Sequence, residues 1–295
     1  MDQGSRAAAG EGGGARRRSP ARCARGVLLL LGSLLLAWTS VGCYVSRSII
    51  FPGSPTALPA PGAALDSGVR VVGYRSEDGV ELRGLLVAGA GEGPRPALVY
   101  FHGNAESAAD NLDVARALAA EGPDVLVAEY RGYGGCPGSP CEEGLVADGR
   151  AAIDAAAREL GRPAAELVLV GRSLGTGVVA RLLAEGHGAG AALISPYTSI
   201  YEVACAIAPR PLVWLAVHDR FDSLAHLRGW SRSPLLVIHG DEDEVIPFAM
   251  GEELARAAGA RFIPLRGVGH NDLFLRSGRL VAREIAAHVR AAHAR

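Results

Sequence analysis

A serine stands between two glycines in residues 171–175 (GRSLG), where an apolar run gives way to a helical pattern. A serine hydroxyl becomes a useful nucleophile when an adjacent base accepts its proton and a third group orients that base. The pentapeptide alone is weak evidence, because glycine supplies 39 of the 295 residues and chance matches are expected. The motif gains meaning where a buried strand turns sharply into a helix.

The sequence around Ser173 provides that context. Residues 166–170 (ELVLV) form an apolar run typical of a buried central strand, and residues 174–183 (LGTGVVARLL) begin a helical pattern. Glycines on both sides of the serine allow the strand and the helix to approach closely. We therefore predict that Ser173 is a catalytic nucleophile rather than a serine in an ordinary turn.

A serine nucleophile requires a histidine and a carboxylate. Where the serine stands at a turn from strand to helix, the acid follows it in the chain and the histidine follows the acid. His270 lies after the last expected strand and before a helix, so it is the predicted base. The spacing alone does not choose among four carboxylates that follow an earlier strand: Asp241, Glu242, Asp243 and Glu244. Four other histidines have weaker claims, and we expect each of them to be structural or solvated: His102, His239, His288 and His293.

The elements that must position these residues alternate along the chain. Eight strands are predicted, at residues 69–74, 80–88, 96–101, 124–130, 166–171, 191–195, 234–240 and 261–265. Helical patterns cover residues 105–120, 142–160, 174–185, 246–258 and 273–292. Short apolar runs separated by helices predict an α/β fold, with an eight-stranded, mainly parallel sheet and helices on both faces.

The alternation stops between about residues 196 and 233, where short apolar and aromatic pieces show no clear strand. This segment predicts a small helical cap over the carboxyl ends of the strands, where ligands bind in open α/β sheets. A long connection packed on the core is the alternative.

Residues 1–42 differ from the rest of the chain. A cluster of arginines precedes the apolar run 27–38 (VLLLLGSLLLAW), which is too short to span a bilayer comfortably and is typical of a signal peptide or membrane anchor. The next residues, TSVGCYVS, resemble a bacterial lipobox that would be lipidated at Cys43, although Ser40 stands where such boxes usually carry leucine. Lipoprotein processing, an uncleaved anchor and ordinary secretion all export the domain, and we expect it to be membrane-attached in a bacterial cell envelope.

Residues 43–68 are proline-rich and are predicted to form an extended tether, followed by a globular domain at 69–295 that carries the predicted site. Removing residues 1–42 removes six arginines and two acidic residues, which leaves 24 basic and 29 acidic residues and a net charge of −5. This charge disfavours nucleic-acid binding. The chain contains no lysine, so a Schiff base, a Ser-Lys dyad and a Walker A loop are excluded. We expect a monomer without cofactor or metal.

Six ordered blocks carry a family resemblance: YFHGNAES, YRGYGG, GRSLGTG, DRFDSL, VIHGDEDEVIP and GVGHND. From about residue 49 onward the chain resembles the α/β hydrolases, especially the small group that includes the depalmitoylating α/β-hydrolase-domain thioesterases. The resemblance selects Asp243 as the acid, four residues before the proline of its block, and His270 as the base. It implies a serine hydrolase that cleaves an acyl ester or thioester of a small or lipid-like substrate. Peptide or amide hydrolysis and a non-catalytic, membrane-tethered binding lipoprotein are the alternatives.

Two smaller predictions concern loops beside this site. The oxyanion donors are expected to be the backbone N–H of Leu174 and a group of the HGNAE segment, either Asn104 or its backbone, unless Asn104 is only a turn or helix cap. Cys136 and Cys141 bracket the segment CPGSPC, and export would permit a disulfide between them. The resembling family offers no support for that bridge.

If the N-terminal interpretation is right, the mature chain begins at Cys43 and carries acyl groups on that residue. Several acyl chains, each methylene contributing about 0.8 kcal/mol, would attach the protein stably to a membrane. Mass spectrometry of the mature N-terminus measures this directly. An unmodified Cys43, or a start at another residue, would contradict lipidation and leave the hydrolase prediction untouched.

Overall fold

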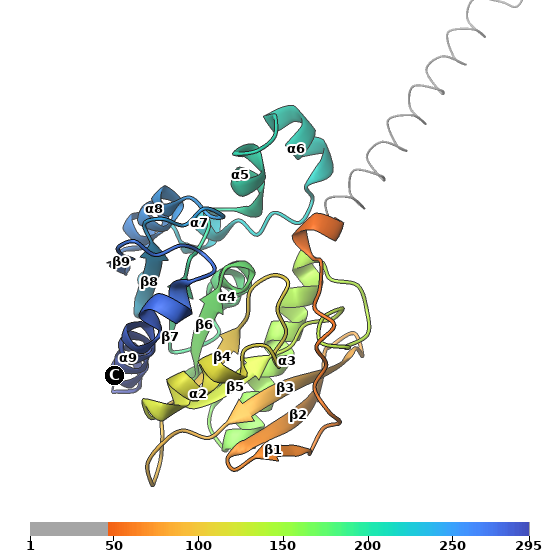
Figure 1. Ribbon diagram of the computed structural model, residues 1–295, viewed down its shortest axis with the longest axis vertical. Helices are drawn as coiled ribbons and strands as arrows, with labels where there is room; N and C mark the ends of the chain where they lie inside the picture. Colours follow the sequence, from red (N-terminus) through yellow and green to blue (C-terminus); the bar gives the residue numbers. More distant parts are fainter. Residues whose placement is uncertain (1–46, 295) are drawn as a thin grey trace, which may run out of the picture.

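A nine-stranded sheet runs through the structure, a computed structural model that describes residues 47–294 (Figure 1). The strand order is β1-β2-β3-β5-β4-β6-β7-β8-β9, antiparallel from β1 to β5 and parallel from β5 to β9. The strands are β1 (Ala64–Asp66), β2 (Val69–Arg75), β3 (Glu81–Val87), β4 (Ala97–Phe101), β5 (Asp124–Ala128), β6 (Val168–Arg172), β7 (Gly190–Ile194), β8 (Leu235–Gly240) and β9 (Arg261–Leu265).

The predicted α/β architecture is confirmed, with one strand more than expected. All eight predicted strands are present as β2 to β9. Most of them contain a buried apolar run or an apolar alternation, whereas the apolar run of β9 is only partly buried. The additional strand β1 has three exposed residues and pairs irregularly with β2, so no hydrophobic pattern announces it.

Five long helices cover the two faces of the sheet. They are α2 (Leu112–Ala120), α3 (Glu142–Leu160), α4 (Leu174–Ala184), α8 (Phe248–Ala258) and α9 (Leu273–His293), and a short 3-10 helix, η1 (Ala164–Glu166), precedes β6. Apolar residues of α3, α4 and α8 belong to one core cluster, and those of α2 and α9 belong to another. The sheet is therefore buried on both sides, as its continuous apolar strands predict.

Helix α2 begins seven residues later than the predicted position 105. Ala105 has a positive φ of 56°, which breaks the helix, and the Ser107 and Asp110 side chains form local hydrogen bonds instead. The segment between β4 and α2 is consequently a loop. It lies at the carboxyl end of the parallel strands, on the same side as Ser173.

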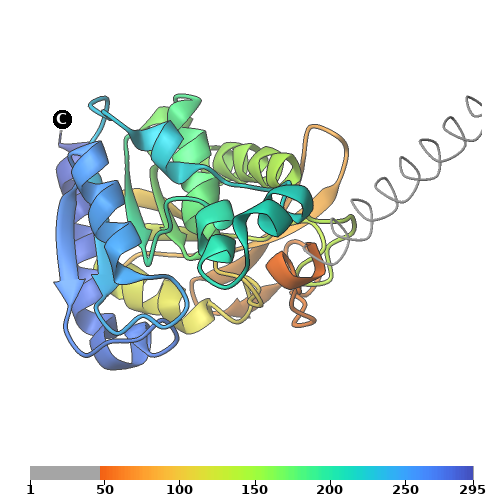
Figure 2. The same ribbon diagram turned by 90° about the horizontal axis from the view of Figure 1, so that it is seen from above.

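Three short helices occupy the predicted cap: α5 (Ile200–Cys205), α6 (Arg210–Ala216) and α7 (Ser223–Leu227). Helix α7 packs against α4 and α8, so it joins the body of the domain. Helices α5 and α6 pack on each other at one end of the molecule, near residues 47–50 (Figures 1 and 2).

The predicted free tether differs from the observed structure over residues 47–68. Phe51 and Leu58 are 6% and 4% exposed, and the Phe51 ring lies 6.2 Å from that of Phe221. Arg47 Nε donates to Asp219 Oδ2 at 2.7 Å. Single apolar residues among prolines make no periodic pattern, which is why the sequence did not predict their burial.

Residues 1–46 lie outside the described part of the chain, and with them the predicted signal segment and Cys43. Within residues 47–294, the helices are all too short or too polar to cross a bilayer.

Replacing Phe51 with alanine should test whether this segment is part of the domain. We expect Phe51→Ala to lower the free energy of unfolding by about 3 kcal/mol, the usual cost of truncating a buried aromatic ring. Ile49→Ala, at a position that is 70% exposed, is the control and should change stability by less than about 0.5 kcal/mol. Equal stability of the two variants in a denaturant titration would show that the segment is not packed.

Candidate active site

Ser173 stands in a strained turn between β6 and α4. Its φ of 49° and ψ of −115° are rare for a residue with a side chain, and its N–H donates to Ile194 O at 2.9 Å. A Cβ at Gly171 would lie 2.6 Å from Gly175 O, and a Cβ at Gly175 would lie 2.1 Å from Phe101 O. Glycine is therefore required at both positions for the strand and the helix to meet. The serine then lies at the tip of the turn, beyond the carboxyl end of the strand.

The structure brings Ser173, His270 and Asp243 together. His270 Nε2 lies 3.1 Å from Ser173 Oγ, and His270 Nδ1 lies 2.8 Å from Asp243 Oδ2. The His270 residue is 6% exposed, and the Asp243 side chain has no exposed surface. An imidazole placed between a hydroxyl and a buried carboxylate can accept the hydroxyl proton at one nitrogen while the other nitrogen is held as a donor.

The Asp243 carboxylate accepts more hydrogen bonds than the one from His270. Its Oδ1 receives the backbone N–H groups of Val245 at 3.0 Å and Ile246 at 2.7 Å. Burial raises the pKa of Asp243, but hydrogen bonds from His239 and His270 outweigh burial and hold that pKa well below its ordinary range. The carboxylate is therefore ionised in the buried site.

A second histidine, His239 at the end of β8, contacts the same carboxylate. His239 Nε2 lies 3.2 Å from Asp243 Oδ2 and 3.1 Å from the carbonyl oxygen of Ile246. Because both neighbours are acceptors, Nε2 must carry the proton. A Cβ at Gly251 would lie 2.2 Å from the other ring nitrogen, so helix α8 fixes the ring from behind. The expectation that His239 is only structural overlooked this contact with the candidate acid.

The four carboxylates in residues 241–244 have different partners. Asp241 Oδ1 accepts the N–H of Gly267 at 2.7 Å, and Glu244 Oε2 accepts the N–H of His270 at 3.2 Å. These two residues hold the backbone of the histidine loop, whereas Asp243 holds the imidazole. Of the four side chains, Asp243 is thus the one placed to orient His270.

The two predicted oxyanion residues line the same cavity as Ser173. Leu174 is the first residue of α4, so its N–H has no acceptor within the helix. The Asn104 side chain is already engaged, because its Oδ1 accepts the N–H of Ala105 and the hydroxyl of Tyr133, both at 3.0 Å. Burial raises the pKa of Tyr133, whose hydroxyl therefore remains a donor.

A buried ion pair beneath this loop links β4 to β5. His102 Nε2 lies 2.8 Å from Glu129 Oε1, and His102 Nδ1 lies 2.8 Å from Gly103 O. Both ring nitrogens face acceptors, which fits a doubly protonated imidazole. Burial lowers the pKa of His102, but the Glu129 charge and its hydrogen bond outweigh burial and raise that pKa overall. Glu129 Oε2 also accepts the N–H of Ala108, so the pair fastens the loop between β4 and α2 at two points.

Arg172, next to the nucleophile in sequence, connects that loop to the histidine loop. Its guanidinium forms an ion pair with Glu106 and donates from Nη2 to the carbonyl oxygen of His270 at 3.2 Å. Neither Arg172 nor Glu106 belongs to the predicted site residues. The position of Arg172 beside Ser173 is the one sequence signal that could have suggested a role for it, since nothing in the sequence reveals that Arg172 binds Glu106 and the backbone of His270.

A cavity of about 360 Å³ opens above Ser173. Its polar end carries Ser173, His270 and Asn104, and the rest of its wall is mainly apolar. The apolar lining comes from residues before β1, from the cap and from the loop after β8: Ile49, Ile50, Ile200, Val203, Ala204, Ile207, Val245 and Ile246. An acyl chain would find an apolar site beside the hydroxyl, which matches the usual division of a small-molecule pocket.

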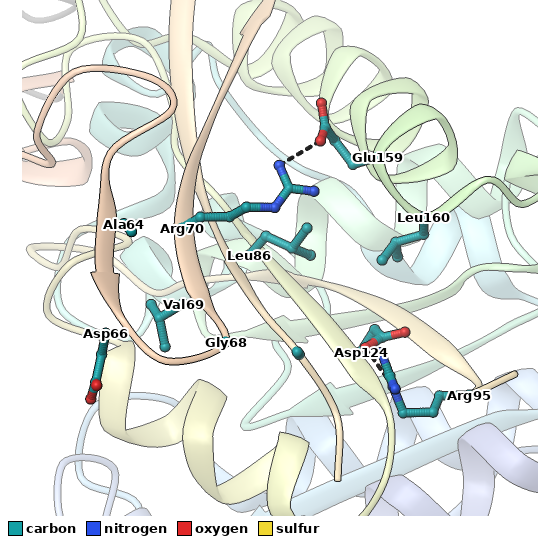
Figure 3. A pocket seen from close by; sticks show the side chains of 11 residues that line it. Ala64, Asp66, Gly68, Val69, Arg70, Leu86, Arg95, Asp124, Glu159 and Leu160 are labelled. Carbon is teal, nitrogen blue, oxygen red and sulfur yellow. Dashed lines mark hydrogen bonds and ion pairs between the residues drawn. The ribbon is translucent and has the colours of Figure 1, made fainter. Parts of the chain in front are cut away.

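A second pocket, of about 380 Å³, lies at the opposite end of the parallel strands, because Asp124 on its wall begins β5 (Figure 3). Its charged side chains are all paired: Arg70 with Glu159, Arg95 with Asp124, and Asp66 with Arg116 outside the pocket. Residues 47–294 also contain no group of three or more His, Cys, Asp or Glu side chains arranged to hold a metal ion. The cavity above Ser173 is therefore the better candidate for a reactive site.

The predicted disulfide is absent from the structure, in which Cys136 and Cys141 are both free thiols. Cys136 is turned into the core, where burial raises its pKa to about 11, and Cys141 stands at the N-cap of α3. Their closeness in sequence misled the prediction, because one side chain packs inward and the other begins a helix.

Comparison with known proteins confirms the family resemblance. The family model described as serine aminopeptidase, S33, matches residues 92–217. An uncharacterized protein of Mycobacterium tuberculosis is 33% identical over 260 residues, covering 86% of this chain and 89% of that protein. Alpha/beta hydrolase domain-containing protein 17C of Xenopus laevis is 31% identical over 210 residues, covering 70% of this chain and 66% of that protein.

A solved structure shares the fold. An esterase of Pyrococcus furiosus matches with a TM-score of 0.63 at 17% identity, covering 80% of this chain and 98% of that chain. This likeness concerns the fold, and the family model and the relatives support a hydrolase.

The buried pair of His102 and Glu129 makes stability depend on pH. Because the pKa of His102 is higher in the folded protein than in the unfolded chain, the pair stabilises the fold fully below about pH 6.5, and this contribution is lost as pH rises through the folded-state value. We expect Glu129→Gln to lower the free energy of unfolding by about 3 kcal/mol just below about pH 6.5, and by less near pH 9.

Denaturant titrations at the two pH values measure this difference. Glu143→Gln, which breaks an exposed pair with Arg181, is the control and should cost less than about 0.5 kcal/mol at either pH. A cost of Glu129→Gln that is the same at both pH values would contradict a charged His102.

Proposed function

Because this chain belongs to the α/β-hydrolase superfamily, we propose that it is a serine hydrolase that cleaves an acyl ester or thioester through Ser173, His270 and Asp243. The observation that supports this most is the geometry of the three side chains. The imidazole of His270 lies between the Ser173 hydroxyl, 3.1 Å from its Nε2, and the buried Asp243 carboxylate, 2.8 Å from its Nδ1. The hydroxyl and the imidazole line a mainly apolar cavity.

The proposed reaction has two half-steps. In the first, Ser173 Oγ attacks the acyl carbonyl carbon while its proton moves to His270 Nε2, and the carbonyl oxygen becomes an oxyanion. Collapse of this intermediate forms a serine ester and expels the alcohol or thiol, which takes the proton from His270. In the second, a water loses a proton to His270 and attacks the serine ester, which releases the carboxylic acid and restores Ser173.

Asp243 has a positioning and electrostatic task in these steps. Its carboxylate accepts the Nδ1–H of His270, which leaves Nε2 free of a proton and directed at Ser173. The same negative charge stabilises the imidazolium that forms on proton transfer. His239, held between Asp243 and Ile246 O, keeps the carboxylate in this orientation.

The oxyanion needs donors that are in place before the reaction. We assign this task to the backbone N–H groups of Leu174 and Asn104, which border the cavity beside Ser173. The Asn104 side-chain oxygen accepts the N–H of Ala105 and the Tyr133 hydroxyl, and these two hydrogen bonds hold the residue that carries the second donor. The His102–Glu129 pair and the Arg172–Glu106 pair then hold the loop that carries this donor.

The cavity favours an acyl chain over a peptide. An enzyme that removes the first residue of a peptide must bind a free ammonium group, which calls for an uncommitted carboxylate near the nucleophile. Among the described residues that line the cavity, Glu106 is the only one with a carboxylate, and that carboxylate is already bound by Arg172 and Asn111. The apolar wall instead suits the hydrocarbon part of an ester or thioester.

Substitution of the three residues tests the proposal. We expect Ser173→Ala and His270→Ala each to reduce the hydrolysis of p-nitrophenyl esters by several orders of magnitude, and Asp243→Asn by about 10⁴-fold, because the asparagine stabilises the wrong imidazole tautomer. The measurement is kcat/KM across esters of increasing chain length, with folding checked by circular dichroism.

Asp241→Asn is the matched control, because Asp241 is a neighbouring carboxylate that binds the Gly267 N–H rather than the imidazole. It should retain activity within about tenfold of the wild type. Wild-type ester turnover by a folded Ser173→Ala variant would contradict the proposed mechanism. Absence of turnover by the folded wild type would instead favour the non-catalytic binding lipoprotein.

A further inference from the structure

Large apolar side chains are exposed on the cap and beside it. Ile207 is 87% exposed and lies between α5 and α6, while Leu212 and Trp214 on α6 are 51% and 61% exposed. Ile49, before the domain, is 70% exposed. We call these four side chains the apolar rim. Soluble surfaces seldom gather such residues in one region without a binding purpose.

The apolar rim is continuous with the candidate active site. Ile49 and Ile207 also line the cavity above Ser173, although they come from segments about 160 residues apart. Residues 47–50 and helices α5 and α6 lie at the same end of the molecule in both views (Figures 1 and 2). An apolar phase that covered the rim would therefore meet the mouth of the cavity.

The sequence that precedes residue 47 indicates what covers the rim. The apolar run 27–38 ends eleven residues before Ile49, and Cys43 stands six residues before it. Eleven residues span at most about 40 Å and six at most about 20 Å, so either kind of anchor keeps Ile49 close to the membrane that holds it. The described chain begins two residues before Ile49, so an anchor in the preceding sequence would tether the domain beside the rim.

We propose that the apolar rim docks on the surface of this lipid bilayer, so that an acyl chain passes from the membrane into the cavity above Ser173. The docking itself is independent of the chemistry, whereas the passage of an acyl chain rests on the proposed function. Tryptophan suits such a position, because its ring prefers the boundary between lipid and water.

Apolar contact rather than charge provides the attraction. The basic side chains around the rim are committed to neighbours: Arg210 pairs with Glu202, Arg47 with Asp219, and the Arg220 guanidinium lies 5.1 Å from the centre of the Tyr201 ring. Docking should therefore be largely insensitive to salt, in contrast to the binding of a basic surface to anionic lipid.

Trp214 reports docking directly in the full-length protein. The chain has three tryptophans, and Trp38→Phe with Trp230→Phe leaves Trp214 alone. In vesicles of phosphatidylethanolamine and phosphatidylglycerol that contain brominated lipid, we expect Trp214 fluorescence to fall about twofold or more, in low and high salt alike. Ser173→Ala should leave this quenching unchanged, so a failure of docking and a failure of the catalytic proposal can be told apart.

The matched control keeps Trp230 alone through Trp38→Phe and Trp214→Phe. Trp230 is half-buried and donates to Ser233 O at 3.0 Å, so it should be quenched little. Unquenched Trp214 would overturn the proposal. A blue-shifted but unquenched Trp214 would also overturn it, because the rim would then be covered by the chain's own apolar run or by a second copy.

Activity gives a second test that does not depend on fluorescence. Leu212→Ser with Trp214→Ser should slow the hydrolysis of a long-chain acyl ester embedded in vesicles about tenfold while leaving the hydrolysis of soluble p-nitrophenyl butyrate unchanged. Leu275→Ser, at an 89% exposed site on α9, should affect neither substrate. Equal rates of the rim variant and the wild type on embedded ester would contradict delivery of the acyl chain through the rim.

Discussion

The buried carboxylate of Asp243 is the point on which the site depends. It has no exposed surface, so its charge must be balanced by donors, and the structure supplies two backbone N–H groups and two imidazoles. Those donors fix the turn after β8, the ring of His239 and the ring of His270 at once. Removal of the charge would leave His270 without orientation and a buried set of donors without an acceptor.

The other half of the site is built on a strained turn. The positive φ of Ser173 persists because Gly171 and Gly175 allow β6, α4 and the end of β4 to touch, and no larger residue fits at either position. Arg172 then joins the two halves, since it binds Glu106 of the oxyanion loop and the backbone of His270. Ser173, His270 and the segment after β4 consequently belong to one connected framework rather than to three separate loops.

Much of this arrangement follows from sequence order, and the rest requires three dimensions. Apolar runs in the sequence predicted β2 to β9. The bounds of α3 match the predicted residues 142–160, because Cys141, in an extended conformation, stands at its N-cap and Gly161, in the left-handed conformation, stands at its C-cap. Hydrophobic patterns in the sequence do not show which polar side chains pair in the protein interior, so the partners of His102 and His239 were not predicted. The packing of Phe51 was missed for a related reason, since one aromatic residue among prolines shows no period.

The position of the N-terminal segment links the fold to the proposed function. Ile49 and Ile50 contribute to the cavity wall together with the cap, so the segment before β1 borders the cavity above Ser173. The most direct test of the central claim, that Ser173 is the nucleophile, is to react the full-length protein with a fluorophosphonate and map the adduct by peptide mass spectrometry. The account predicts a single adduct on Ser173 and none in the Ser173→Ala variant. An adduct on another residue, or labelling of Ser173→Ala at the wild-type rate, would contradict it.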